Sequence, residues 1–185
     1  MAQDKQIVLE KDELGRMISR MAHEIVEKTP NASELTLIGI RSRGVHLARR
    51  IARKIEEMGK FAPPVGSLDV SSYRDDRAGQ QRAGNGGVLE VPFAVDEKTV
   101  VLIDDVIFRG RTIRAAMEAV ARLGQPKRIL VAVLVDRGAR ELPIRADVVG
   151  KNVDAGEGQR VNVLLIESDG IDQVTVGRWQ SRGTV

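Results

Sequence analysis

Asp104 and Asp105 end a continuous hydrophobic stretch and precede a glycine-containing turn, in a segment that reads VLIDDVIFRGRT over residues 101–112. Backbone N–H groups of such a turn, leading into a helix, can bind an anion, and the helix dipole adds to the attraction. Two carboxylates beside the turn would repel a phosphate that they faced, but they can accept hydrogen bonds from sugar hydroxyls or help to hold Mg²⁺. The pattern is typical of a ribose 5-phosphate site. The alternative is an ordinary capped helix after a strand.

A second turn of the same kind follows the hydrophobic run at residues 35–40. It contains Ser42, Arg43 and Gly44, and Arg41 precedes it. Two anion-binding turns suit a substrate that carries phosphate at both ends.

The elements around these turns alternate between strands and helices. Apolar residues at the 3.6-residue period predict helices, and short Val/Ile/Leu-rich runs predict strands. The predicted helices are 11–28, 44–58 and 112–123; the predicted strands are 35–40, 65–70, 99–104 and 128–135, with weaker ones at 161–166 and 174–176. Residues 72–87 are polar and glycine-rich, which predicts a loop with a returning arm at 88–93. This order predicts one α/β domain over residues 1–185, with a mostly parallel sheet that binds ligands at the carboxyl ends of its strands.

Composition excludes several classes of function. Lys and Arg total 29 against 26 Asp and Glu, a net charge of +3 that is too small for a strongly basic nucleic-acid binder but compatible with a local basic patch. The chain has no Cys and two His, which argues against thiol catalysis and Cys- or His-built metal sites. Without an apolar N-terminal segment or a run of 18 apolar residues, we expect a cytoplasmic protein with no membrane partner.

Four segments carry a resemblance to a known family. Residues 101–113 resemble the phosphoribosyl-pyrophosphate (PRPP) motif of type I phosphoribosyltransferases. Together with IGIRSRG, LDVSSYRDD and VLVDRGARELPIRADVVGKNV, they make residues 7–178 similar to the PyrR family of bifunctional pyrimidine-operon regulators and uracil phosphoribosyltransferases. The resemblance implies a type I phosphoribosyltransferase fold with a flexible loop at about 72–90 and a small hood at about 136–160.

The implied reaction converts uracil and PRPP to UMP and pyrophosphate with Mg²⁺. The resemblance places Asp104 and Asp105 on the ribose hydroxyls, near the Mg²⁺ that accompanies PRPP, and makes them catalytic together with Arg43. The implied binding residues are Ser42, Arg43, Gly44, Phe108, Arg109, Gly110, Arg111 and Thr112 for PRPP phosphates, Tyr73, Arg74, Asp75 and Asp76 in the flexible loop, and Val135, Asp136, Arg137 and Gly138 for uracil.

The resemblance also implies a regulatory activity, in which UMP promotes binding to the leader mRNA of the pyrimidine operon. The matching basic residues are Arg20, His23, Arg140, Arg145 and Lys151. Because Arg20 and His23 are three residues apart, they share a helix face. The family forms homodimers and homotetramers, so we expect one of these states.

Three departures from the family pattern concern both activities. Arg109 replaces a usual Thr in the phosphate loop, where it either adds a contact to phosphate or crowds the loop. Ala139 replaces a usual His, and residues 153–158 lack a Pro-Thr-Ser-rich stretch; both changes lie by the implied RNA face. Two other functions remain as alternatives to a uracil transferase that also regulates. One is a UMP-sensing RNA regulator with weak transferase activity. The other is a transferase for a purine base, which the VDRG and RELPIRAD segments disfavour.

Overall fold

The computed structural model describes residues 5–59, 61–70 and 89–178. The predicted flexible-loop residues Tyr73, Arg74, Asp75 and Asp76 lie outside these ranges. Within the described part, no helix is both long and apolar enough to cross a membrane.

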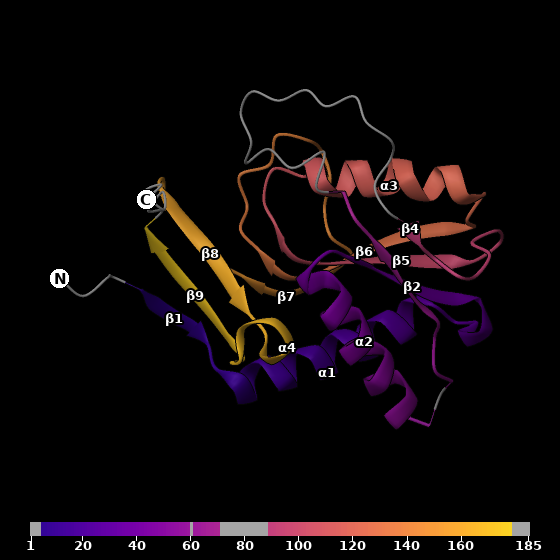
Figure 1. The fold of residues 1–185 in the computed structure, drawn as a ribbon, viewed down its shortest axis with the longest axis horizontal. Coiled ribbons are helices and arrows are strands. Elements are labelled where there is room, and N and C mark those ends of the chain that lie inside the picture. Colours follow the sequence, from indigo (N-terminus) through magenta and orange to yellow (C-terminus); the bar gives the residue numbers. More distant parts are fainter. Residues whose placement is uncertain (1–4, 60, 71–88, 179–185) are drawn as a thin grey trace.

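A six-stranded sheet forms the centre of the fold (Figure 1). Its strands are β4 (Leu89–Glu90), β3 (Val65–Leu68), β2 (Leu35–Ile40), β5 (Thr99–Ile107), β6 (Arg128–Asp136) and β7 (Val148–Asn152), in that spatial order. Every neighbouring pair is parallel except β3 with β4. The predicted parallel α/β sheet is confirmed.

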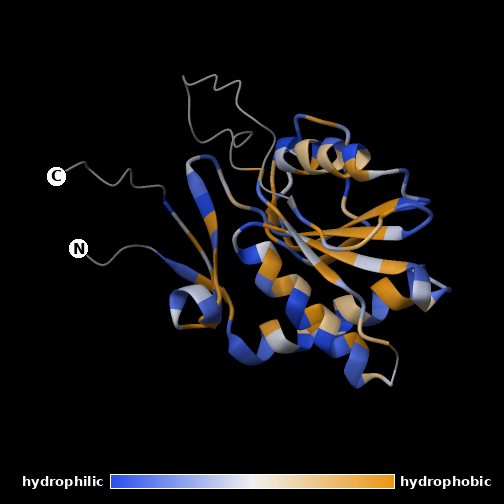
Figure 2. Ribbon diagram, turned by 45° about the vertical axis from the view of Figure 1, so that its right-hand side comes forward, coloured by the Kyte–Doolittle hydropathy of each residue, from blue (hydrophilic) through white to orange (hydrophobic). Residues whose placement is uncertain are grey.

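Helices cover both faces of this sheet. Helices α1 (Lys11–Lys28) and α2 (Arg43–Glu57) pack on one face, and α3 (Arg111–Leu123) packs on the other (Figure 1). Strand β5 contributes side chains to the helix–sheet interface on each face. Val101 and Ile103 point to α1 and α2, whereas Val100 and Leu102 point to α3. Figure 2 shows hydrophobic residues concentrated in these strands and on the helix sides turned toward them. A short 3₁₀ helix, η1 (Ala32–Glu34), leads into β2.

A second, antiparallel sheet stands beside the first (Figure 1). It contains β1 (Gln6–Leu9), β9 (Gln173–Arg178) and β8 (Gln159–Leu164), with the one-turn helix α4 (Ile166–Asp169) between β8 and β9. Strands β8 and β9 match two weak sequence predictions, whereas β1, β7 and α4 were not predicted. The expected hood range, 136–160, runs from the end of β6 through β7 of the large sheet to the start of β8.

Two glycines allow α2 to begin close against the sheet. A Cβ atom at Gly39 would lie 2.4 Å from the Cα of Val45, and one at Gly44 would lie 2.4 Å from the carbonyl oxygen of Ile103. Real Cβ atoms do not approach backbone this closely. The start of α2 is therefore held directly beside β5, the strand that ends in the two aspartates.

The close approach predicts a stability difference between two matched substitutions. Gly39→Ala should destabilise the chain by about 1–3 kcal/mol, because the methyl group must displace backbone. Gly15→Ala, on an exposed helix position with nothing within 4 Å of its Cβ, should instead stabilise by about 0.5–1 kcal/mol. Urea unfolding of both variants measures this, and equal effects would contradict the assigned role of Gly39.

Candidate active site

A pocket of about 990 Å³ opens at the carboxyl end of β5. Its walls come from three places: the segment from Asp104 to Ile113, the small-sheet segment from Glu157 to Leu164, and single residues that include Arg43 and Arg137. The structure thus brings the predicted acidic pair, the predicted phosphate loop and one predicted uracil residue to a single pocket. It also adds β8, which sequence reasoning did not assign to the site.

The two aspartates are held by the backbone that follows them. Asp104 is 2% exposed, and its Oδ1 accepts a hydrogen bond of 2.9 Å from the N–H of Asp105. Oδ1 of Asp105 accepts one of 3.0 Å from the N–H of Val106. Strand β5 continues through both residues to Ile107, three residues beyond the predicted end. The carboxylates are therefore fixed on a strand rather than on a free loop, so their orientation is set before a ligand arrives.

The phosphate loop turns sharply at Gly110. This residue has φ +92°, in the left-handed region that favours glycine, and it directly precedes the first residue of α3. A Cβ there would contact the side chains of Leu142 and Ile144 at 3.5 and 3.6 Å. The first-turn N–H groups of a 13-residue helix begin at this loop, which is the geometry that binds an anion.

The segment Arg137–Ile144, which we call the strap, lies along the phosphate loop. Successive loop carbonyls accept hydrogen bonds from it. Arg137 N–H donates to Ile107 O at 3.0 Å, Arg140 Nη1 donates to Phe108 O at 2.8 Å, and Glu141 N–H donates to Arg109 O at 3.1 Å. The loop and the strap are therefore joined mainly through main-chain atoms of the loop.

Glu141 adds charge pairs to this docking. Its Oε1 lies 3.0 Å from Arg109 Nε, and its Oε2 lies 2.6 Å from Arg111 Nη2 and 3.0 Å from Arg111 Nε. Sequence reasoning did not single out Glu141, although it is one of the two acidic residues of the RELPIRAD segment. Both basic residues of the predicted phosphate loop thus share one carboxylate.

Arg43 is held by Asp169, the last residue of α4, which connects two strands of the small sheet. Its Nε and Nη2 donate to the two carboxylate oxygens of Asp169 at 3.1 and 2.7 Å. Hydrogen bonding to Asp169 raises the pKa of Arg43, with a further contribution from the charge of Asp105. The pKa of Asp169 is lowered by the same pair. Ser42, the N-cap residue of α2, is exposed, and its peptide bond to Arg41 is cis.

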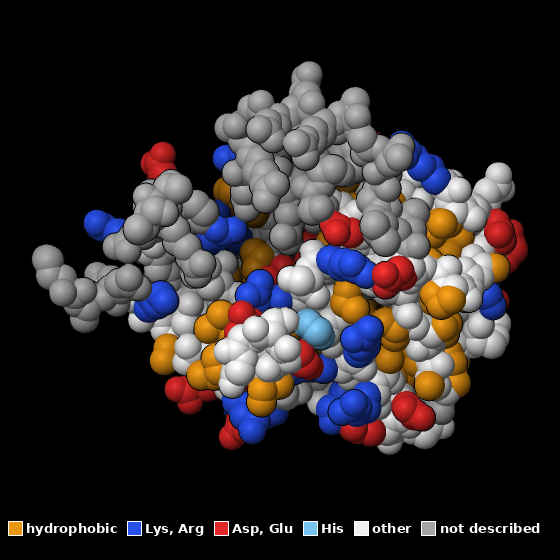
Figure 3. Space-filling view, in the orientation of Figure 1, with side chains coloured by type: hydrophobic (Ala, Val, Ile, Leu, Met, Phe, Trp, Pro, Cys, Tyr) orange, Lys and Arg blue, Asp and Glu red, His pale blue; other side chains and the backbone are white. Residues whose placement is uncertain are grey.

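Further contacts join α2 to α4 and to the residues that follow it. His46 Nε2 and Ser168 Oγ are 3.0 Å apart, and Arg50 forms paired hydrogen bonds with both Glu167 and Asp172. Hydrogen bonding to Arg50 lowers the pKa of Glu167. Figure 3 shows basic side chains gathered over α2 with acidic ones among them. The position of Arg43 therefore depends on the small sheet, which sequence reasoning could not anticipate.

Comparison with known proteins agrees with this geometry. The family described as "Phosphoribosyl transferase domain" matches residues 6–163. The "Bifunctional protein PyrR" of Pelotomaculum thermopropionicum is 49% identical over 176 residues, covering 95% of this chain and 97% of the relative. The protein of the same name from Chloroflexus aurantiacus is 51% identical over 178 residues, covering 96% and 97%. The chain belongs to the PyrR family.

Solved structures confirm the predicted phosphoribosyltransferase fold. The hypoxanthine phosphoribosyltransferase of Trypanosoma cruzi superposes with a TM-score of 0.75 at 17% identity, covering 95% of this chain and 96% of that one. The Staphylococcus aureus enzyme gives 0.70 at 16% identity, covering 95% and 91%. At this identity the likeness concerns the fold alone, so it assigns no base to this PyrR-family chain.

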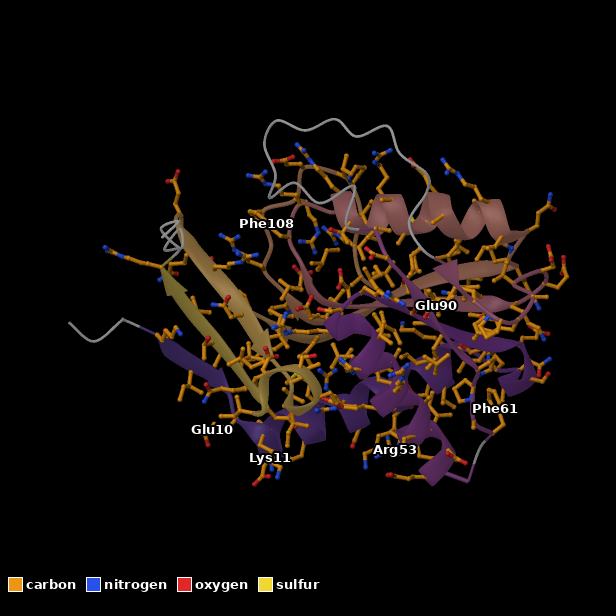
Figure 4. All side chains as sticks on the ribbon, in the orientation of Figure 1. Glu10, Lys11, Arg53, Phe61, Glu90 and Phe108 are labelled. Atoms are coloured by element: carbon orange, nitrogen blue, oxygen red, sulfur yellow. The ribbon has the colours of Figure 1, made fainter. Side chains whose placement is uncertain are left out.

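The predicted uracil residues lie at the end of β6 and directly after it. Val135 is buried, and Asp136 closes the strand and pairs with Arg140. The guanidinium of Arg137 stacks on the ring of Phe108, with Cζ 3.9 Å from the ring centroid. Arg137 Nε is buried and has no hydrogen-bond partner among the residues that the structure describes, and desolvation lowers the pKa of this side chain. Figure 4 shows Phe108 between the small sheet and the start of α3, so this stack borders the pocket.

The predicted RNA residues fall into two groups. On α1, Arg20 reaches to β7, where its Nη2 donates to Val149 O at 2.9 Å, and the exposed His23 bonds Ser19 O through Nδ1. This brings Arg20 beside the strand that carries Lys151, which is partly buried. The second group lies later in the chain, where Arg145 is exposed directly after the strap.

Arg140 is more enclosed than the sequence suggested. Its guanidinium donates to the carbonyls of Phe108, Gly138 and Ile144 and pairs with Asp136. These contacts give it a role inside the protein, where it holds the strap against the loop. Whether Arg140 also meets RNA stays a prediction.

The donor set suits a magnesium ion that arrives with its substrate. Over the described residues, no three Asp, Glu or His side chains converge as a metal cage. Mg²⁺ in phosphate-transfer sites is held by one or two carboxylates plus substrate phosphates, with water completing its shell. Asp104 and Asp105 provide carboxylates of that kind next to the phosphate loop.

Proposed function

We propose that this chain transfers the phosphoribosyl group of PRPP to uracil and releases pyrophosphate. The observation that carries the proposal is the meeting of an acidic pair, a glycine turn at a helix start and Arg43 in one pocket. The relatives' printed name and the match to a phosphoribosyltransferase domain support the same activity. In the reaction, the bond from ribose C1 to pyrophosphate oxygen breaks, a bond from C1 to a uracil nitrogen forms, and that nitrogen loses its proton.

Different residues bind different parts of PRPP. The loop from Phe108 to Thr112 holds the 5′-phosphate at the start of α3, and Asp104 and Asp105 accept hydrogen bonds from the ribose hydroxyls. Ser42, Arg43 and Gly44 hold the pyrophosphate. Catalysis is then mostly positioning and electrostatic stabilisation of the leaving group.

Magnesium enters with PRPP. When bound, it balances the charge of the leaving pyrophosphate, and Asp104 and Asp105 are the residues that would hold it, directly or through water. Arg43 contributes a fixed positive charge at the same end of the substrate.

Uracil is placed by the end of β6 and the two residues after it, Val135 to Gly138. A base edge offers carbonyl oxygens and N–H groups, and the unpaired Nε of Arg137 supplies one buried donor near the pocket. The Phe108 ring beside it is contacted by two guanidinium groups, with Cζ of Arg137 3.9 Å and Cζ of Arg109 5.2 Å from its centroid.

The test is product formation with competing bases. Purified chain, PRPP and Mg²⁺ should form UMP from uracil, and hypoxanthine should give no nucleotide. Nucleotide formation from hypoxanthine but not uracil would replace the proposal with a purine transferase. UMP binding without turnover on either base would favour the regulator with weak transferase activity.

A second proposed activity is UMP-promoted binding to the leader mRNA of the pyrimidine operon. The relatives are named as bifunctional proteins, and Arg20, His23 and Arg145 are exposed basic residues outside the pocket. RNA binding should be tighter with UMP, and log K should fall with log salt by about 0.7 per phosphate neutralised. Binding that ignores UMP, or the absence of binding at low salt, would count against this activity.

We further propose that the chain is a cytoplasmic homodimer or homotetramer. Closed symmetric assemblies of these sizes are the commonest among soluble proteins. Sedimentation velocity at micromolar concentration distinguishes both states from a monomer, which would contradict this proposal.

Arg109→Thr tests what the unusual loop residue does. We expect the KM for PRPP to rise about three- to tenfold, because Thr removes a charged donor next to the 5′-phosphate while the exposure of Arg109 limits its contribution. Steady-state kinetics with varied PRPP measures this. A several-fold fall in that KM together with faster turnover would show that Arg109 crowds the loop instead.

A further inference from the structure

The strap connects the phosphate loop to the predicted RNA residues. Arg140 Nη1 of the strap donates to Phe108 O, and the main-chain N–H groups of Glu141 and Leu142 donate to Arg109 O. The Arg140 guanidinium also bonds the strap's own carbonyls. Arg145 follows it directly in the chain. A change in how the strap meets the loop therefore reaches Arg140 and Arg145 over a few residues.

The Glu141 carboxylate holds the guanidinium groups that a phosphate in the loop would use. It pairs with both Arg109 and Arg111, the two cations of a loop that also presents the start of α3. A phosphate monoester in this loop draws on the same guanidinium groups. Its dianion next to the Glu141 carboxylate would place like charges together, which is unfavourable.

The competition favours phosphate. The side chains of Arg109, Glu141 and Arg111 are each 40–47% exposed. Ion pairs exposed to this degree contribute little to stability. A phosphate carries about twice the charge of a carboxylate and gains the first-turn N–H groups of α3 in addition. Phosphate can therefore take over the guanidinium groups. The bonds from the Glu141 and Leu142 N–H groups to Arg109 O then lose the ion pairs that stand beside them.

We propose that Glu141 is a built-in competitor for the phosphate loop, which a phosphate monoester displaces, and that this displacement alters the strap and with it the RNA-facing residues. The proposal rests on the proposed function, since it names how an occupied nucleotide site is sensed at the RNA face. Both the 5′-phosphate of PRPP and that of UMP have the required chemistry. In this arrangement Glu141 is a positioning residue for the loop arginines and not a catalytic one.

The first experiment measures ligand affinity in E141Q, with E118Q as the matched control. Glu118 pairs with Arg114 on the exposed side of α3, so the control loses the same kind of charge pair away from the loop. Ribose 5-phosphate and UMP should bind E141Q about three- to tenfold more tightly than the parent, while E118Q should match the parent. Uridine, which lacks phosphate, should bind E141Q and the parent equally. Unchanged or weaker ribose 5-phosphate binding by E141Q would overturn the proposal.

The second experiment measures the response of the strap by hydrogen exchange. In the parent, adding ribose 5-phosphate should speed exchange of the Glu141 and Leu142 amides, and in E141Q these amides should exchange fast with or without it. Slower or unchanged exchange in the parent would contradict the link to the strap. This readout needs neither turnover nor RNA, so it separates failure of the inference from failure of the proposed activities.

RNA binding completes the test. E141Q should bind the leader RNA with a smaller dependence on UMP than the parent and E118Q show. An unchanged dependence on UMP would overturn the link between Glu141 and the RNA face. Should the parent itself ignore UMP, the proposed regulatory activity fails, and the affinity and exchange measurements still decide the role of Glu141.

Discussion

Asp105→Asn is expected to lower kcat/KM for UMP formation by about 10²–10³-fold, as removal of one preorganised electrostatic group typically does. Asp105 lies in the pocket wall, and its charge acts on Arg43. The amide keeps the shape of the side chain and an oxygen that can still accept from Val106 N–H, so the local backbone is preserved. What the variant loses is the negative charge that we propose to lie beside the ribose and the accompanying Mg²⁺.

The measurement is initial rate over varied PRPP and Mg²⁺, with thermal unfolding as the check on folding. Asp12→Asn is the control, because Asp12 is exposed in the first turn of α1, away from the pocket. It should leave kcat/KM unchanged. Activity of Asp105→Asn within about twofold of the parent would defeat the assigned role of Asp105.

The elements with strong local patterns were predictable, because their own residues determine them. Helix α1 has the predicted bounds, and β2 matches the predicted run at 35–40. Strand β5 extends past the prediction because its pairing with β6 continues to Ile107 beside Asp136. Polar residues at a strand end resemble a loop in sequence, and only the neighbouring strand shows that they continue the ladder.

The small sheet was less predictable for a physical reason. Strand β1 is four residues long, and it is paired with β9 near the other end of the chain. Strand β7, at the edge of the large sheet, was missed for a local reason, because it contains Gly150, Lys151 and Asn152, residue types that disfavour a strand assignment. Short strands are stabilised by their partners, and a local pattern does not contain the partner.

Site residues, too, were predictable where they belong to a local motif and were missed where they depend on distant parts of the chain. The aspartates, Gly110 and Arg43 were predictable because each belongs to a short contiguous motif. Glu141 and Asp169 were not, since each meets its arginine partner across a separation of 30 to 126 residues. Acids that restrain the basic residues of a phosphate site are therefore visible only once the chain is folded.

Arg43→Gln is the second variant for which we expect a large effect. Kinetically, kcat/KM for PRPP should fall about 10²-fold or more, because a fixed positive charge at the proposed pyrophosphate end of the site is lost. Structurally, Asp169 loses its guanidinium partner while its Oδ2 still accepts from Leu165 N–H, which should cost about 1–3 kcal/mol of stability.

The stability part of this prediction has a defined pH dependence. Arg43 lowers the pKa of Asp169 in the folded chain, so the pair contributes stability above the unfolded pKa of about 3.9 and loses it as pH falls through the folded value. The stability difference between parent and Arg43→Gln should therefore be full at pH 7 and shrink below about pH 4. Urea unfolding at pH 7 and near pH 3 measures it, and a difference that grows in acid would contradict the pairing.

Asp169→Asn separates the anchoring of Arg43 from its charge. This variant keeps the Arg43 guanidinium but weakens the paired hydrogen bonds to residue 169 that orient it. We therefore expect a smaller kinetic loss, about tenfold, mostly in the KM for PRPP. The double variant should be no slower than Arg43→Gln alone, because Asp169 can act on the pyrophosphate only through Arg43. Additive losses in the double variant would mean that Asp169 affects turnover by another route, through the small sheet that α4 holds against α2.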